Sequence, residues 1–124
     1  MLQLPRGVAV GPDGSIVVAD TMNRRVQVFT GEGVLVRSFG SNGDGPGQFG
    51  WPCGVAVGAG GEILVSDVRR QNVQVFSGEG TYVRTIVEKG KMGMDDFHPW
   101  GVCVDGEGSV YVGCAATMSV VMLS

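Results

Sequence analysis

Pro5-Arg6-Gly7-Val8-Ala9-Val10 opens a phrase that returns as Pro52-Cys53-Gly54-Val55-Ala56-Val57 and again as Pro99-Trp100-Gly101-Val102-Cys103-Val104. The spacing is 47 residues each time, because 52 − 5 = 47 and 99 − 52 = 47. A fixed period in the forties indicates a repeat architecture, in which each unit buries an apolar face against its neighbour. The 124 residues therefore divide into repeats at about 1–47, 48–94 and 95–124.

Each repeat is predicted to form short strands joined by glycine turns. In the first repeat the apolar, β-branched runs are 8–10, 16–19, 25–29 and 34–39. Gly11-Pro12-Asp13-Gly14 separates the first two, and it supplies a proline that fixes φ and a glycine that accepts positive φ. The second repeat copies all four runs and the third supplies three, so we expect eleven strands and no helix of useful length.

Four-stranded antiparallel meanders repeated at this period are blades of a β-propeller. The fold class is thus all-β, with about two and three-quarter blades of an incomplete ring. We expect the first strand of each repeat to be innermost, since Ala9 and Ala56 suit the crowded axis. An incomplete ring leaves apolar blade faces open. We expect the chain to be a segment of a longer protein whose remaining blades cover those faces; self-association is the alternative.

Composition limits the class of protein. Glycine accounts for 22 residues, yet 44% of the chain is hydrophobic, which is typical of folded structure and not of a disordered linker. The net charge of −3 argues weakly against a general nucleic-acid binder. Three cysteines without paired spacing suggest reduced thiols and a cytoplasmic protein. One histidine and no Cys-x-x-Cys give no metal site, and neither a signal peptide nor a membrane span nor a cofactor is expected.

The stretch Asp20-Thr21-Met22-Asn23-Arg24-Arg25-Val26-Gln27-Val28-Phe29, with the preceding Gly-Val-Ala-Val-x-Pro-Asp-Gly phrase, resembles the NHL repeat. The connector Gly45-Pro46-Gly47-Gln48-Phe49 is similar too, and the likeness covers essentially the whole chain. Arg24 replaces the histidine of the Asn-His-Leu stretch that gives the family its name. The resemblance implies a propeller of the kind found in tripartite-motif ubiquitin ligases, in some bacterial sensor kinases and in a zinc-dependent lyase.

A lyase of that kind needs several histidine ligands, and His98 is the one histidine of this sequence. No spacing brings a nucleophile together with a base, so we predict no catalytic residues and no enzyme activity for this segment. The predicted function is a non-catalytic binding module that recruits a protein substrate or partner for a larger protein, which we expect to be a ubiquitin ligase. Single-stranded RNA binding is the alternative, and a propeller enzyme is the third class.

Propeller loops alternate between two faces, and the charges divide accordingly. The turns after the first and third strands carry only acids, namely Asp13, Glu32, Glu62, Glu79, Asp105 and Glu107. The opposite face is mixed and holds the basic groups Arg6, Arg24, Arg25, Arg69, Arg70, Lys89 and Lys91. It also carries the acids Asp20, Asp44, Asp67, Glu88, Asp95 and Asp96. A polar or anionic ligand is expected to prefer the mixed face.

The position between the repeated proline and glycine varies, being Arg6, Cys53 and Trp100 in turn. A variable position in a constant frame is where a scaffold displays specificity residues, and arginine and tryptophan dominate binding hot spots. The predicted ligand-binding residues are Arg6, Asn23, Arg24, Arg69, Arg70 and Trp100. The competing interpretations are solvated loop arginines, a Trp100 packed on a neighbouring blade and Cys53 as a small filler. Asp20 and Asp67 are expected to be structural, accepting backbone N–H groups or pairing with Arg25.

Overall fold

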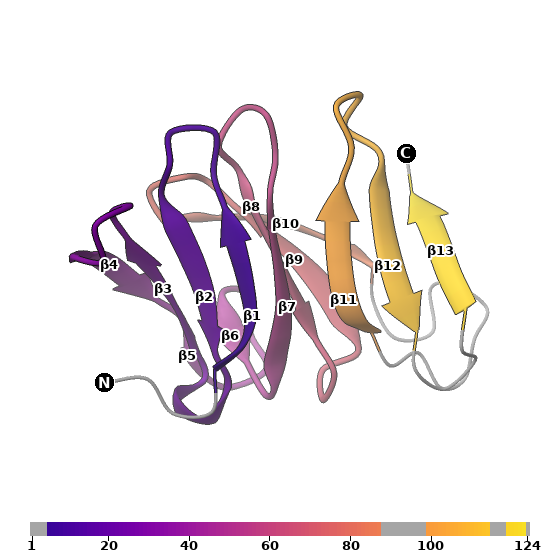
Figure 1. Ribbon diagram of the computed structural model, residues 1–124. Helices are drawn as coiled ribbons and strands as arrows, with labels where there is room; N and C mark the ends of the chain where they lie inside the picture. Colours follow the sequence, from indigo (N-terminus) through magenta and orange to yellow (C-terminus); the bar gives the residue numbers. More distant parts are fainter. Residues whose placement is uncertain (1–4, 88–98, 115–118, 124) are drawn as a thin grey trace.

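The computed structural model describes residues 5–87, 99–114 and 119–123, which form three antiparallel sheets standing side by side in chain order (Figure 1). Blade 1 consists of β1 (Pro5–Val10), β2 (Ile16–Asp20), β3 (Arg25–Phe29) and β4 (Leu35–Phe39). Blade 2 consists of β7 (Pro52–Val57), β8 (Ile63–Asp67), β9 (Asn72–Phe76) and β10 (Tyr82–Val87). Blade 3 consists of β11 (Pro99–Val104), β12 (Val110–Cys114) and β13 (Ser119–Leu123). The predicted all-β blades of four, four and three strands are confirmed.

The pairing register repeats with the sequence. Val8 of β1 lies opposite Val18, Val55 of β7 opposite Val65, and Val102 of β11 opposite Val112. Alternating apolar positions and tight glycine turns fix a register, since a slip of one residue would turn every side chain to the other face. The turn glycine Gly14 has a φ of 86°, as the Gly-Pro-Asp-Gly sequence predicts.

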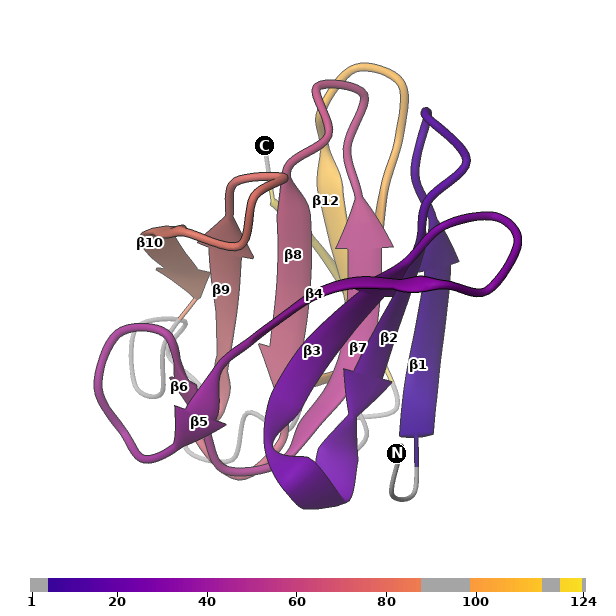
Figure 2. The ribbon, with the colours of Figure 1, turned by 90° about the vertical axis from the view of Figure 1, so that its left-hand side faces the viewer.

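Two local features were not predicted from the sequence. A 3-10 turn, Thr21–Asn23, follows β2 where a polar loop was expected, and it closes on Arg24 in the left-handed conformation with a φ of 53°. The connector between blades 1 and 2 forms a short parallel pair, β5 (Ser41–Asn42) with β6 (Gln48–Phe49), which lies beside β9 (Figure 2).

Gln74 of β9 holds this connector in place. Its amide oxygen accepts the Gly47 N–H at 2.9 Å, and its amide nitrogen donates to the Gln48 carbonyl at 3.0 Å. Strands of two residues show no alternation in the sequence, so the sequence could not predict β5 and β6; their pairing with each other is seen only in the folded chain.

Each blade packs through two distinct faces, because successive side chains of a strand point to opposite sides. The front face packs on the preceding blade in blades 2 and 3. It is formed by Val55, Val57, Ile63 and Val65 in blade 2 and by Val102, Val104, Val110 and Val112 in blade 3. The corresponding residues of blade 1 are Val8, Val10, Ile16 and Val18. The back face packs on the following blade in blades 1 and 2. It is formed by Ala9, Val17, Ala19, Val26 and Val28 in blade 1 and by Ala56, Leu64, Val73 and Val75 in blade 2. The corresponding positions of blade 3 include Cys103 and Tyr111.

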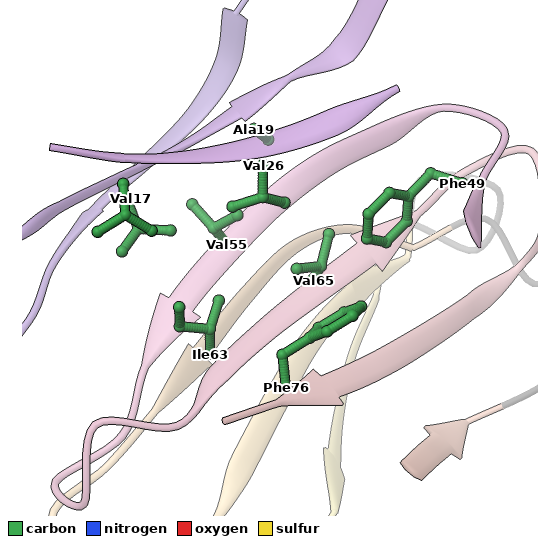
Figure 3. Packing of buried hydrophobic residues seen from close by; sticks show 9 residues of the cluster. Val17, Ala19, Val26, Phe49, Val55, Ile63, Val65 and Phe76 are labelled. Carbon is green, nitrogen blue, oxygen red and sulfur yellow. The ribbon is translucent and has the colours of Figure 1, made fainter. Parts of the chain in front are cut away.

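The hydrophobic core lies where a back face meets a front face. Figure 3 shows Val17, Ala19 and Val26 of blade 1 facing the front of blade 2, with Phe49 and Phe76 at one end. A second cluster joins the back of blade 2 to the front of blade 3. A buried valine contributes about 1.5 kcal/mol or more, so packing between the blades supplies much of the stability.

Close approach of the inner strands explains the glycine of the repeated phrase. A Cβ atom on Gly7 would collide with the carbonyl oxygen of Cys53, and one on Gly54 would collide with the carbonyl oxygen of Trp100. A buried hydroxyl bridges each of the two interfaces between blades. Thr21 Oγ1 donates to the Pro52 carbonyl at 2.7 Å between blades 1 and 2, and Ser66 Oγ donates to the Trp100 carbonyl at 2.8 Å between blades 2 and 3. The prediction that the first strands are innermost and need small residues there is confirmed.

Among residues 5–87, 99–114 and 119–123, no helical segment has the length and hydrophobicity of a transmembrane span.

Candidate functional site

The inner strands bring the three variable residues of the Pro-x-Gly phrase to one groove. Arg6, Cys53 and Trp100 line it with the glycine and valine that follow each of them, and the groove has a volume of about 650 Å³. Arg6 and Trp100 are exposed, whereas Cys53 is only 3% exposed. The side-by-side packing of β1, β7 and β11 creates this juxtaposition from positions 47 residues apart.

The Arg6 guanidinium lies between two indole rings. Its central carbon is 5.6 Å from the centre of the Trp51 ring and 6.0 Å from that of the Trp100 ring. Cation–π contacts of this length are worth about 0.5–1 kcal/mol each at exposed sites. Among the described residues, no carboxylate lies within salt-bridge distance of Arg6. The guanidinium thus lies near two aromatic rings, and it forms no ion pair with a carboxylate of the described residues.

Trp51 is a neighbour of the Arg6 guanidinium that sequence reasoning missed. It is half-buried and immediately precedes β7, at the place that His98 occupies in the third repeat. Aligning the repeats would have found it, since both residues stand directly before the repeated proline and next to the variable position. His98 itself lies outside the described residues.

Cys53 fills the floor of the groove. Burial raises the pKa of its thiol to about 11, with Asp67 adding to the effect and the Arg6 charge opposing it. A thiol with this pKa is protonated at neutral pH and is a poor nucleophile. This agrees with the interpretation of Cys53 as a small filler.

Asp67 orients the segment that carries Trp51. The carboxylate is fully buried and accepts backbone N–H groups of Gly50 at 2.7 Å, Trp51 at 2.8 Å and Arg70 at 3.0 Å. One aspartate thus ties the start of β7 to the loop after β8. Its predicted structural role is confirmed.

Asp20, the equivalent residue of blade 1, accepts hydrogen bonds from side chains. It is fully buried, and its Oδ2 accepts Arg25 Nε at 2.8 Å, Asn23 Nδ2 at 3.0 Å and Gln27 Nε2 at 3.1 Å. The predicted pairing with Arg25 is confirmed. Asn23, one of the predicted ligand-binding residues, is engaged in this network and supports the turn after β2.

The other predicted loop residues lie away from the groove lining. Arg24 donates from Nη1 to the Met22 carbonyl at 3.0 Å, and the side chain of Arg69 packs over Gly50. The Nε atoms of Arg24 and Arg70 are buried and have no hydrogen-bond partner among the described residues. Of the six predicted binding residues, the described groove gathers Arg6 and Trp100 and not Asn23, Arg24, Arg69 or Arg70. Lys89, Lys91, Glu88, Asp95 and Asp96, which were also assigned to this face, lie outside the described residues.

The face formed by the turns after the first and third strands is not uniformly acidic, contrary to the prediction from the charges of those turns. Arg37 of β4 reaches it and donates from Nη1 to the Gly78 carbonyl at 2.9 Å. Hydrogen bonds from Ser15 hold the pKa of Asp13 below its usual range, and the Arg37 charge acts in the same direction. The prediction was wrong because it counted charges in the turns alone, whereas a long side chain on a strand extends to the turn face.

No group of three histidine, cysteine, aspartate or glutamate side chains in the described part of the chain could hold a metal ion.

Comparison with known protein families gives a match for two segments of the chain. Residues 2–29 and 49–76 match the NHL repeat family. No curated protein matches the sequence.

Solved structures of propeller-containing proteins resemble the fold. Hydrazine synthase of Kuenenia stuttgartiensis superposes with a TM-score of 0.77 at 16% identity, over 99% of this chain and 33% of that one. Virginiamycin B lyase from Staphylococcus aureus gives 0.69 at 12% identity, over 97% and 41% of the two chains. A chain of a nidogen/laminin complex gives 0.70 at 16% identity, over 98% and 48%. The chain thus spans a third to a half of these proteins. Identities this low show the fold alone, which is that of β-propeller blades, and residues 2–29 and 49–76 of these blades are similar to the NHL repeat.

Proposed function

We propose that this NHL-repeat propeller segment is a non-catalytic module that binds a protein partner in the groove between Arg6 and Trp100. One observation carries the proposal: the Arg6 guanidinium is fixed between two indoles at an open groove, with no carboxylate of the described residues in reach. A partner side chain can supply the missing negative charge.

The chemistry of the groove defines the partner segment. Charge-assisted hydrogen bonds from guanidinium to carboxylate are among the strongest polar contacts, and a planar guanidinium can bind both oxygens. The exposed ring of Trp100 and the half-buried ring of Trp51 offer apolar surface beside that contact. An aspartate or glutamate flanked by an aliphatic or aromatic residue is therefore the expected anchor. Tryptophan and arginine together are the residues that most often dominate protein interfaces.

At a finer level, we propose that the parent protein is a tripartite-motif ubiquitin ligase or a relative acting in the cytoplasm, and that this groove selects its substrate. The support is the sequence resemblance of the repeats. A full-length reading frame that encodes a RING and a B-box before the propeller would agree with this, whereas a signal peptide would contradict it.

Single-stranded RNA is the second candidate ligand, because the exposed indole of Trp100 beside an arginine also suits base stacking. The dependence of affinity on salt concentration distinguishes RNA from a protein partner. Phosphate contacts release counterions, so RNA affinity falls steeply between low and physiological salt, whereas a partner anchored on indoles and one carboxylate responds weakly. We favour the protein partner, since acidic residues share this face with the arginines.

The test measures tryptophan fluorescence while peptides with one acidic residue beside a leucine, or single-stranded poly-uridine, are titrated into the protein. Arg6→Glu and Trp100→Ala are expected to weaken peptide binding about tenfold or more, the loss expected for a charge-assisted contact of about 1.5–3 kcal/mol. Glu32→Lys on the opposite face is the matched control and should leave binding unchanged. Arg70→Glu reports on the loops outside the groove. Unchanged affinity in Arg6→Glu and Trp100→Ala would place the site elsewhere.

A further inference from the structure

A second hollow, here named the turn hollow, opens on the face formed by the turns after the first and third strands. It lies between blades 1 and 2, where the turns after β1 and β7 stand side by side at the top of Figure 1. Its volume is about 520 Å³, within the range of about 300–1,000 Å³ that ligand pockets have. Val17, Val28 and Ile63 form an apolar floor and are each 2% exposed. Both walls are parts of blades 1 and 2.

Two exposed carboxylates stand at the rim of the turn hollow. Asp13 belongs to the turn after β1, and Glu79 belongs to the turn after β9 of the next blade. Asp13 Oδ1 accepts the Ser15 N–H at 3.0 Å. In the part of the chain that the structure describes, neither carboxylate forms an ion pair. Their negative charge is therefore not balanced by a direct partner.

Arg37 is the one basic side chain among the described residues that line the turn hollow, and it is half-buried. Its Nη1 donates to the Gly78 carbonyl at 2.9 Å, which ties β4 of blade 1 to the turn that carries Glu79. The guanidinium thus helps to hold one wall in place. Two carboxylates against one guanidinium leave the lining net negative.

An adjoining hollow extends this acidic surface along blade 1. It has a volume of about 510 Å³ and shares Asp13, Ser15 and Arg37 with the turn hollow. Its own acidic residue is Glu32, in the turn after β3. The two hollows together therefore present three carboxylates against one guanidinium, in two neighbouring depressions.

We propose that the turn hollow binds a lysine or arginine side chain from a basic segment of a protein partner. The aliphatic stem lies on the apolar floor, and the cationic head reaches Asp13 and Glu79. Long basic side chains combine an apolar stem with a charged head, which matches a floor of valine and isoleucine below an acidic rim. A second cation of the same segment lies beside Glu32 in the adjoining hollow. Complementary charge of this kind selects the partner and fixes its register.

This site is separate from the groove at Arg6, whose expected anchor is an acidic residue. The two lie on opposite faces and share no lining residue. The module therefore recognises two segments of opposite charge, one on each face. The basic segment is a protein segment, since the phosphates of a nucleic acid would be repelled by the carboxylates at the rim.

The experiment is fluorescence anisotropy of a labelled hexapeptide with two adjacent lysines, titrated with the purified chain at physiological salt. Two altered peptides separate the two parts of the contact. Acetyl-lysine keeps the aliphatic stem and removes the charge, whereas 2,3-diaminopropionate keeps the charge and removes most of the stem. Both are expected to bind more weakly than the lysine peptide.

Variants of the protein locate the contact. Asp13→Asn and Glu79→Gln should each weaken binding by up to about fivefold, and together by about tenfold or more, as expected for exposed ion pairs. The matched control is Glu107→Gln, because Glu107 is exposed, stands two periods of 47 residues beyond Asp13 and lies outside the lining of both hollows. It should leave the affinity unchanged. Arg6→Gln should leave it unchanged too, so the result does not depend on the function proposed for the Arg6 groove.

Four outcomes would overturn the proposal. The first is a lysine peptide that does not bind. The second is a loss in Glu107→Gln equal to that in Asp13→Asn, because the attraction would then belong to acidic turns in general. The third is a diaminopropionate peptide that binds as tightly as the lysine peptide, because the apolar floor would then take no part. The fourth is an acidic peptide that binds the wild type and is lost in Arg37→Gln, which would make this an anion site.

Folding of each variant is checked by circular dichroism. Asparagine at position 13 retains an oxygen that can accept the Ser15 N–H, so the turn after β1 is expected to keep its shape. If Asp13→Asn nevertheless fails to fold, Glu79→Gln decides the matter, because Glu79 lies in a different turn of a different blade.

Discussion

Replacing Gly54 by alanine adds one methyl group at the tightest contact between blades 2 and 3. The new Cβ would overlap the Trp100 carbonyl oxygen, and it would lie 2.6 Å from Ser66 Oγ and 3.2 Å from the Cα of Gly101. Two of these three neighbours are backbone atoms of β11, which cannot rotate away as the end of a flexible side chain can. The whole inner strand must therefore shift.

The size of the effect follows from three contributions. Overpacking a well-filled interior costs about 1–3 kcal/mol. Displacing β11 also weakens the 2.8 Å bond from Ser66 Oγ to the Trp100 carbonyl, and a hydrogen bond of this kind is worth about 1 kcal/mol. Alanine also lowers the conformational entropy of the unfolded chain relative to glycine, which by itself would stabilise the folded state by about 0.4–1 kcal/mol. The free energy of unfolding therefore falls by roughly 2–3 kcal/mol, since the entropy gain offsets only the loss from the weakened hydrogen bond and leaves the cost of overpacking.

The assay is denaturant and thermal unfolding at one low protein concentration, so that self-association does not enter the comparison. A loss of this size in a domain of this length lowers Tm by roughly 10 °C. Gly106→Ala is the control, because no described atom lies within 4 Å of its added methyl group, and it should change stability by less than about 1 kcal/mol. If Gly54→Ala is as stable as Gly106→Ala, the inner strands do not approach as closely as described.

Three further predictions concern buried and titrating groups. Asp67→Asn replaces a buried carboxylate that accepts three backbone N–H groups, and it should lower the free energy of unfolding by about 2 kcal/mol or more, whereas Asp44→Asn at an exposed position should not. Cys53 is buried with a pKa of about 11, so iodoacetamide at neutral pH should modify Cys103 much faster, as peptide mass spectrometry would show; equal rates would contradict the buried thiol. Hydrogen bonds led by that from the Ser109 N–H lower the pKa of Asp105 below its ordinary value of 3.8. The ionised Asp105 carboxylate therefore stabilises the folded state above the ordinary pKa, and this stabilisation is lost as pH falls through the lowered pKa. The Asp105→Asn variant should lose less stability on acidification than the wild type, as unfolding measured across a pH series would show.

Much of the local structure could be predicted because it depends on neighbours in sequence. The alternation of apolar residues in runs such as 25–29 and the glycine turns between runs specify strands, hairpins and register. The 47-residue period then indicates that these hairpins repeat as blades, and the small residues of the Pro-x-Gly-Val-Ala-Val phrase indicate the inner strand.

The candidate site could be predicted only in part. Arg6 and Trp100 were found because one position varies inside a constant phrase, but their partner Trp51 was not, since its side chain meets Arg6 across two blades. Asp20 and Asp67 occupy the same place in the repeat and still bind different groups. Asn23 stays a predicted ligand-binding residue, and only the structure shows that its Nδ2 donates to Asp20.

The sequence by itself determined the strands, their order and the blade as the unit of folding, because the hydrogen-bonded hairpins are local and their spacing is periodic. Only the tertiary structure decided which side chains meet between blades, because those contacts depend on how twisted sheets stack and on residues 47 positions apart. The glycine of the repeated phrase shows both levels. The sequence shows that Gly7, Gly54 and Gly101 recur. Only the packed blades show that a Cβ atom on the first two would collide with a carbonyl oxygen of the next blade, whereas no described atom lies within 4 Å of a Cβ atom on the third.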